Sequence, residues 1–144
     1  MVLKLRLVID SNILFAALIK EGITSKLLLS ERLELFCPER LIEEFKKYEE
    51  DLLSKTHRSK EDFERFLSIL ESRIEIVPKS EFEDWVKDAK RVCKLDDFPF
   101  VALAKALDCA VWSNDMELKK FAEETGYVEL LSTKEVLEKL RIKP

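Results

Sequence analysis

The hydrophobic and polar positions of this chain follow two different periods. Short, nearly unbroken apolar runs are typical of strands that are covered on both faces, and each is too short to form an independent helix. Between them, apolar residues recur at helical spacing. We therefore expect strands at 5–9, 33–37, 74–77, 110–113 and 128–131.

Helices are expected between these strands, and turn residues mark several of their ends. We expect them at 11–19, from Thr24 to Leu29, from Pro38 to about Leu53, from Ser59 through Leu70, from Ser80 to Cys93, from Pro99 to Leu107, from Asp115 to Glu124, and from Ser132 or Thr133 to about Leu140.

Alternating strands and helices require crossover connections, which make a sheet parallel. The pattern predicts one domain over residues 1–144, an α/β protein with a three-layer α/β/α sandwich. Its parallel sheet would have four to five strands. The two helices between the second and third strands would form a helical arm beside the sheet.

Charge and cysteine content narrow the class of protein. The net charge of −4 argues against a protein that simply coats nucleic acid, although a nuclease with an acidic site remains compatible with it. The three cysteines, Cys37, Cys93 and Cys109, lack metal-ligand spacing. With no signal peptide and no long apolar run, we expect reduced thiols in a cytoplasmic protein without a membrane segment.

Acidic residues stand where predicted strands end. Asp10 follows the first strand, and Asp115 follows the fourth through Ser113. In a parallel sheet both positions lie at the same edge, where α/β proteins bind ligands. Asp96 and Asp97 precede the buried helix from Pro99. We expect Asp97 to point inward, because it directly precedes the apolar run, but each of these Asp residues is also a favourable helix cap.

A fourth carboxylate is expected from the helix that begins near Pro38. Its core stripe contains Leu41 and Phe45. At about 100° per residue, Glu43 points away from that stripe and Glu44 lies at its margin. Glu44 is therefore the candidate, with Glu43 as the adjacent alternative.

Four carboxylates gathered at one edge would repel each other strongly unless a cation neutralised them. A set of oxygen ligands without His or Cys suits Mg²⁺ or Mn²⁺, ions that organise phosphates and activate water. The predicted catalytic residues are also the predicted metal ligands: Asp10, Glu44, Asp97 and Asp115.

The chain resembles PIN-domain proteins of the small prokaryotic type that includes the VapC toxins. The resemblance spans essentially the whole chain, and its first and last pieces are the most specific. The matching pieces are residues 8–12, residues 38–45 with Glu44, Asp97 leading into 101–104, and residues 111–115.

This resemblance implies a metal-dependent endoribonuclease that leaves a 5′-phosphate and a 3′-hydroxyl without a covalent enzyme intermediate. Asp10, Glu44, Asp97 and Asp115 would hold one or two divalent ions. Asn12 would orient Asp10 or a water, and Ser113 would support the ligands. The resemblance also implies an RNA substrate, an antitoxin protein as partner, and a homodimer.

A basic stripe lies next to these acids in the sequence. Its residues, Lys87, Lys90, Arg91 and Lys94, recur at helical spacing. They would contact RNA phosphates, or they form a solvated helix face paired with Asp84 and Asp88. The connector at 55–60 is a second basic candidate.

Two other functions compete with the nuclease. One is a PIN-like RNA-binding or scaffold protein that keeps the fold without catalysis. The other is a phosphoryl-transfer protein of the haloacid-dehalogenase type, which requires a second Asp two residues after Asp10. Asn12 occupies that position and argues against it.

Overall fold

The computed structural model describes residues 3–19 and 21–141, and within them five strands form one parallel sheet in the order β3-β2-β1-β4-β5. The strands are β1 (Leu5–Ile9), β2 (Leu33–Pro38), β3 (Ile74–Val77), β4 (Ala110–Trp112) and β5 (Leu130–Leu131). The α-helices are α1 (Ser11–Ile19), α2 (Ile23–Leu28), α3 (Glu39–Lys55), α4 (Lys60–Arg73), α5 (Glu83–Val92), α6 (Phe98–Leu107), α7 (Met116–Thr125) and α8 (Thr133–Arg141).

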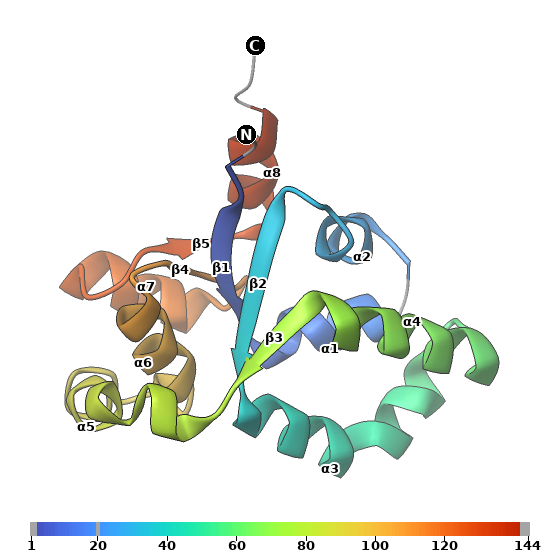
Figure 1. Ribbon diagram of the computed structural model, residues 1–144, viewed down its shortest axis with the longest axis horizontal. Helices are drawn as coiled ribbons and strands as arrows, with labels where there is room; N and C mark the ends of the chain where they lie inside the picture. Colours follow the sequence, from blue (N-terminus) through green and yellow to red (C-terminus); the bar gives the residue numbers. More distant parts are fainter. Residues whose placement is uncertain (1–2, 20, 142–144) are drawn as a thin grey trace.

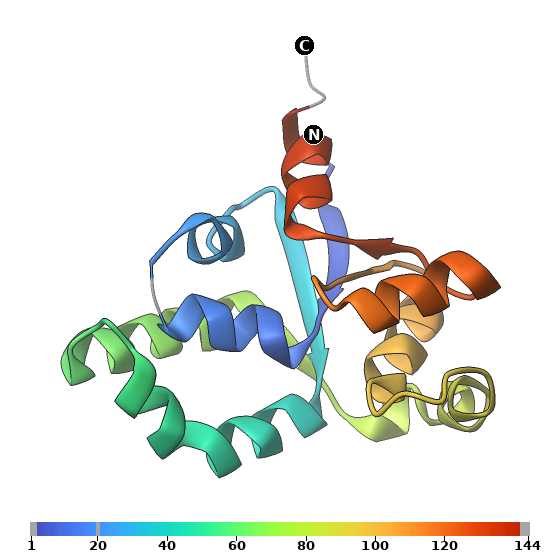
Figure 2. The same cartoon turned by 180° about the vertical axis from the view of Figure 1, so that it is seen from behind.

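Helices cover both faces of this sheet, so the predicted three-layer sandwich is confirmed. Helices α1 to α4 lie on one side and α5 to α7 on the other (Figures 1 and 2). The chain crosses the sheet in one direction through β1, β2 and β3, and in the opposite direction through β4 and β5. Right-handed crossovers therefore place the two sets of helices on opposite faces.

The neighbouring strands β1 and β4 form the switch point of the sheet, because the helices that follow them leave toward opposite faces. Open α/β sheets bind ligands in the crevice at such a point. Ile9 is paired with Trp112, so Asp10 and Ser113 are the next residues on the two strands. Leu7, Val8, Ile9, Val111 and Trp112 are fully buried, which holds this edge firmly in the core.

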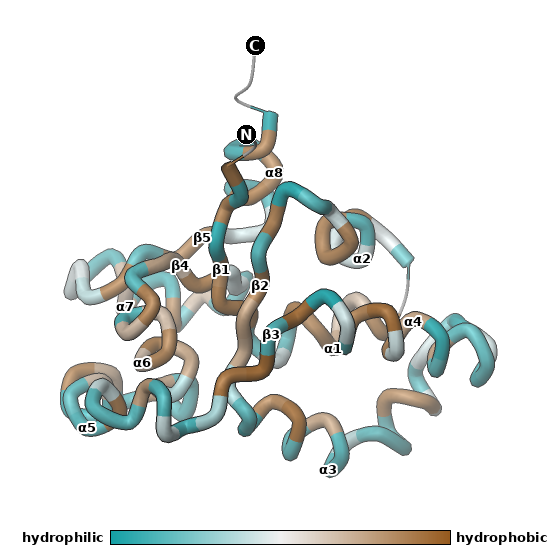
Figure 3. Tube along the Cα trace, viewed as in Figure 1, coloured by the Kyte–Doolittle hydropathy of each residue, from teal (hydrophilic) through white to brown (hydrophobic). Residues whose placement is uncertain are grey.

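The predicted helical arm is formed by α3 and α4. In Figure 3 both helices alternate between hydrophobic and hydrophilic segments, as expected for helices with one buried face. Phe45 of α3 stacks on Phe63 of α4 with ring centroids 6.3 Å apart. Among the described residues, none of the helices is both long and apolar enough to cross a membrane.

Two predicted helix starts were wrong. Thr24 does not cap α2, because the cap position is Gly22 and the Ser25 hydroxyl accepts the Gly22 N–H at 2.9 Å. Pro38 ends β2, where it is paired with Val77, and α3 begins one residue later. Proline has no N–H to donate, but it is tolerated at the end of a strand.

Other boundaries also differ from the prediction, most clearly those of α5 and β5. Ser80 lies in a short 3₁₀ turn (Lys79–Glu81), and α5 begins only at Glu83. The fifth strand is limited to Leu130–Leu131, although Val128 is also buried. A buried apolar residue such as Val128 can therefore lie in the turn before a strand rather than in the strand itself.

Arg58, in the basic connector at 55–60, has a structural role. Its side chain is only 8% exposed. The guanidinium donates to the Ala17 carbonyl at 3.0 Å and lies 4.1 Å from the ring centroid of Phe66. Arg58 therefore ties the helical arm to α1, and its guanidinium is engaged by Ala17, Phe66 and Glu21 within the fold.

Replacing Arg58 with alanine is expected to lower the free energy of unfolding by about 2 to 3 kcal/mol, because both a charged hydrogen bond and a cation–π contact are lost. Urea unfolding followed by circular dichroism measures this change. Lys60→Ala, an exposed neighbour, is the control and should change stability by less than about 0.5 kcal/mol. Equal effects from both substitutions would contradict the structural role.

Candidate active site

Asp10 lies at the end of β1 and is only 2% exposed. One carboxylate oxygen accepts the Ile13 N–H at 3.0 Å and so caps α1, while the other accepts the Ser113 hydroxyl. Burial raises the pKa of Asp10, although these hydrogen bonds oppose the rise and the nearby charge of Asp115 adds to it. Asp10 is thus a rigidly held, buried carboxylate.

Ser113 connects Asp10 to Asp115. Its fully buried hydroxyl donates to Asp10 and accepts the Asp115 N–H at 3.0 Å. The Asp115 side chain accepts the Leu118 N–H at 2.9 Å and caps α7. One hydroxyl therefore sets the relative positions of two predicted site residues.

Asp97 has the most unfavourable surroundings of the four acids. It occupies the cap position of α6, but its side chain accepts no capping hydrogen bond there. Burial and then repulsion by the surrounding carboxylates raise its pKa from the usual 3.8 to about 6. In order of their effect on Asp97, these carboxylates belong to Asp10, Asp115, Glu44 and Asp96.

Glu44 reaches this group from α3. Its side chain is 25% exposed and pairs with Arg40 at 3.4 Å, whereas the adjacent Glu43 is exposed to solvent. Arg40 also donates to the backbone carbonyl of Asp96 at 3.2 Å. Sequence reasoning missed Arg40, although its i, i+4 spacing to Glu44 was a visible signal.

The donor set suits a hard divalent cation. The acids supply only carboxylate oxygens, and among the described residues Asp97 has no cation as an ion-pair partner. Repulsion from the carboxylates of Asp10, Asp115 and Glu44 contributes to the raised pKa of Asp97. Even so, among residues 3–19 and 21–141 no group of three or more Asp, Glu, His or Cys side chains is arranged so that it could hold a metal ion.

The two asparagines have different positions. The Asn12 side chain is exposed, and the Asn12 backbone N–H helps to lower the pKa of the Asp10 carboxylate. Asn114 holds the start of α8, since its amide accepts the Thr133 N–H at 2.8 Å and donates to the Thr133 hydroxyl at 2.9 Å. The buried Trp112 ring of β4 donates to the same hydroxyl at 3.0 Å, so Trp112 and Asn114 both bind Thr133 at the start of α8.

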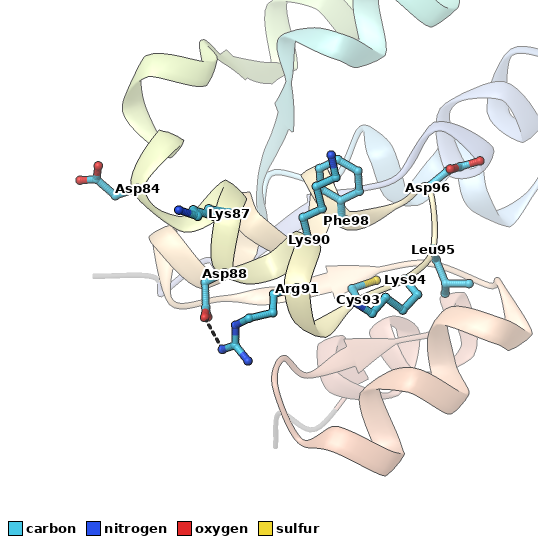
Figure 4. Close-up of a pocket in the computed structure, with 10 residues that line it drawn as sticks. All are labelled: Asp84, Lys87, Asp88, Lys90, Arg91, Cys93, Lys94, Leu95, Asp96 and Phe98. Atoms are coloured by element: carbon cyan, nitrogen blue, oxygen red, sulfur yellow. Dashed lines mark hydrogen bonds and ion pairs between the residues drawn. The ribbon is translucent and has the colours of Figure 1, made fainter.

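The basic stripe borders an open surface hollow of about 790 Å³, the outer hollow, that extends to Asp96 (Figure 4). Lys87, Lys90 and Arg91 lie on α5, whereas Lys94 lies beyond the end of this helix at Val92, so the prediction that one helix carries all four was wrong. Arg91 is not free there. It pairs with Asp88 at 2.6 Å, and Asp88 also accepts the Tyr127 hydroxyl at 2.5 Å. Lys87, Lys90 and Lys94 are exposed and have no carboxylate partner among the described residues.

Comparison with known proteins gives three findings. The family model of the PIN domain matches residues 8–141. No curated protein matches the sequence. A crystal structure described as VapBC2 from Rickettsia felis bound to a DNA fragment from their promoter contains a similar chain, with a TM-score of 0.58 and 16% identity, covering 89% of this chain and 98% of that chain.

The raised pKa of Asp97 predicts that, in the protein without metal, this residue lowers the free energy of unfolding by an amount that depends on pH. A carboxyl that binds its proton more tightly when folded destabilises the fold above its folded pKa of about 6 and has no such effect below 3.8. The full shift is equivalent to about 3 kcal/mol, which solvent screening of this partly exposed group reduces to about 1 to 2 kcal/mol.

Asp97→Asn is therefore expected to raise the free energy of unfolding at neutral pH by about 1 to 2 kcal/mol. This gain should disappear as the pH falls through the window from about 6 to 3.8. Urea unfolding in chelator across this range tests it. Asp96→Asn is the matched control and should gain less, because Asp96 is exposed. A gain that does not change with pH would contradict the assignment.

Proposed function

We propose that this protein is a metal-dependent endoribonuclease, because the chain belongs to the PIN-domain family. PIN domains are generally nucleases that use divalent metal ions. The observation that supports the proposal is the pKa of Asp97, which burial and the charges of Asp10, Asp115 and Glu44 raise, next to a buried Asp10 at the end of β1.

In this proposal, Asp10, Glu44, Asp97 and Asp115 hold one or two Mg²⁺ or Mn²⁺ ions. A bound ion would activate water and neutralise charge on the phosphodiester. The Asp10 carboxylate is held by the Ile13 N–H and the Ser113 hydroxyl, and the Asp115 carboxylate is held by the Leu118 N–H. Asn12 is exposed beside Asp10 and would hydrogen-bond a water or the RNA.

The substrate assignment rests on the lysines beside the carboxylates. Lys87, Lys90 and Lys94 form the part of the basic stripe that has no acidic partner among the described residues, and the outer hollow that they border reaches Asp96. Phosphate contacts of this kind position a strand without reading its sequence. We propose that RNA enters along this surface, whereas Arg91 mainly stabilises the link between α5 and Tyr127.

We further propose that the protein is the toxin of a toxin–antitoxin pair and acts as a homodimer. The resemblance of the fold to a chain in the VapBC2 structure supports this proposal. Expression of the protein should then arrest growth, and co-expression of a small DNA-binding protein encoded beside it should relieve the arrest. Growth that continues unchanged would contradict the toxin role.

The nuclease proposal is tested with single-stranded RNA and Mn²⁺ or Mg²⁺, with and without chelator. Asp10→Asn keeps an oxygen acceptor for the Ile13 N–H, whereas the charge and the oxygen that accepts the Ser113 hydroxyl are lost, so this variant preserves the cap of α1 while it removes a metal ligand. We expect cleavage to fall at least about a hundredfold, and by about ten- to a hundredfold in Ser113→Ala.

Neighbouring acids provide matched controls for this experiment. Glu44→Gln and Asp97→Asn should abolish cleavage, whereas Glu43→Gln and Asp96→Asn should retain most of it, because both controls change exposed residues. RNA that binds without being cut would identify the protein as a catalytically silent RNA-binding member of the family. Cleavage that persists in Asp10→Asn would place the active site elsewhere.

Metal binding has a second readout that does not depend on cleavage. Mn²⁺ at a hundred times its dissociation constant should stabilise the wild-type fold by about 2.7 kcal/mol and raise its melting temperature. Asp10→Asn should lose most of this increase, and Glu43→Gln should keep it. Differential scanning fluorimetry measures these shifts, and an equal shift in all three proteins would argue against a site at these carboxylates.

A further inference from the structure

A second cavity lies beside the carboxylates, and none of the roles assigned above uses it. This cleft of about 340 Å³ is enclosed by the start of α3, the 3₁₀ turn at Lys79, α5 and the start of α6. We call it the Arg40 cleft. Its lining combines three cations, Arg40, Lys79 and Lys90, with the aromatic ring of Phe98.

Arg40 forms the boundary between this cleft and the candidate active site. It lines the cleft, pairs with Glu44 at 3.4 Å and donates to the Asp96 carbonyl at 3.2 Å. A ligand in the cleft would therefore lie next to the predicted metal ligands. Its anionic group could contact Arg40 without displacing the carboxylates themselves.

Phe98 links the Arg40 cleft to the outer hollow, because its partly exposed ring lines both. The Lys90 ammonium lies 5.7 Å from the centroid of this ring. In Figure 4 the Lys90 side chain extends beside Phe98, between Lys87 and Asp96. An aromatic ring next to unpaired lysines is the combination with which proteins bind single-stranded nucleic acid.

We propose that the Arg40 cleft binds one nucleotide of single-stranded RNA, with the base stacked on Phe98 and the adjoining phosphates contacted by Arg40, Lys79 and Lys90. This inference rests on the proposed ribonuclease function and adds to it the position of a nucleotide next to the scissile bond. Only an unpaired base can expose its face for stacking, so the cleft selects single strands over duplexes.

The acidic residues of the cleft are compatible with this arrangement. Glu39 and Glu43 belong to α3, as Arg40 does, whereas Lys90 belongs to α5 and Lys79 to the 3₁₀ turn. Carboxylates only accept hydrogen bonds, so neither contacts a phosphate, and the stacking of the base on Phe98 requires neither of them. In this arrangement the phosphates contact the three cations, Arg40, Lys79 and Lys90, and not the two carboxylates.

The test measures the affinity of a fluorescein-labelled single-stranded RNA by anisotropy in chelator, where metal-dependent cleavage cannot occur. A series of oligonucleotides carries one abasic site at successive positions. For wild type, the abasic site that falls in the cleft should weaken binding by about five- to 150-fold, the contribution of one stacked base. For Phe98→Leu, which keeps an apolar side chain, the same abasic site should change affinity by less than about twofold.

Lys79→Ala tests the phosphate contact independently of Phe98. Lys79 is exposed, so its loss should leave the fold intact while it weakens RNA binding and reduces the salt dependence of affinity by about one counterion. Lys26→Ala, an exposed lysine of α2 outside the cleft, is the matched control and should bind RNA like wild type.

The outcomes separate this inference from the ribonuclease proposal. If wild type cleaves RNA but Phe98→Leu responds to abasic sites as wild type does and Lys79→Ala binds normally, the nucleotide site is wrong and the nuclease stands. If the predicted binding pattern appears without any cleavage, the nucleotide site stands and the nuclease is wrong. Absence of RNA binding, or equal binding of duplex, overturns the nucleotide site.

Discussion

The pairing of β1 with β4 is the constraint on which the candidate active site depends. This register places a buried hydroxyl, that of Ser113, between the Asp10 carboxylate and the backbone N–H of Asp115. A hydroxyl has only one proton to donate, and here the proton is directed to Asp10 while the oxygen accepts the Asp115 N–H. The orientation of Asp10 is consequently coupled to the path of the chain after β4, which Asn114 and Thr133 anchor to α8.

Three of the four acids stand where a helix begins, namely Asp10 before α1, Asp97 before α6 and Asp115 before α7. Free N–H groups and the helix dipole give these ends partial positive charge. The fold thereby offsets part of the repulsion among the carboxylates. Capping and metal binding are compatible roles for the same side chain. Asp97 differs from the other two because its side chain makes no capping hydrogen bond.

Much of this arrangement was predictable from local sequence. The apolar run that ends at Asp10 and the Gly126 that ends α7 in a left-handed conformation carry their signals within a few residues. Contacts between distant segments were not predictable in this way. Arg58 reaches Ala17, and Arg40 reaches Asp96, through side-chain directions that no periodicity encodes.

The same distinction applies to the site. Helical periodicity separated Glu44 from Glu43 because the two differ by about 100° around one helix. The apparent basic stripe was less informative, since Arg91 and Asp88 also belong to a network with Tyr127 that sequence spacing does not reveal. The role of Phe98 in lining two cavities depends on how α5, α6 and the start of α3 pack together.

The edges of the sheet have a consequence for how this protein associates with other chains. Strand β5 has only two residues, and β3 has four and is followed directly by Pro78, which has no N–H to donate. Short edge strands with a nearby proline are poor templates for an added strand, which protects a protein against edge-to-edge aggregation. Partners of this chain should accordingly dock through side chains on its helices rather than extend its sheet.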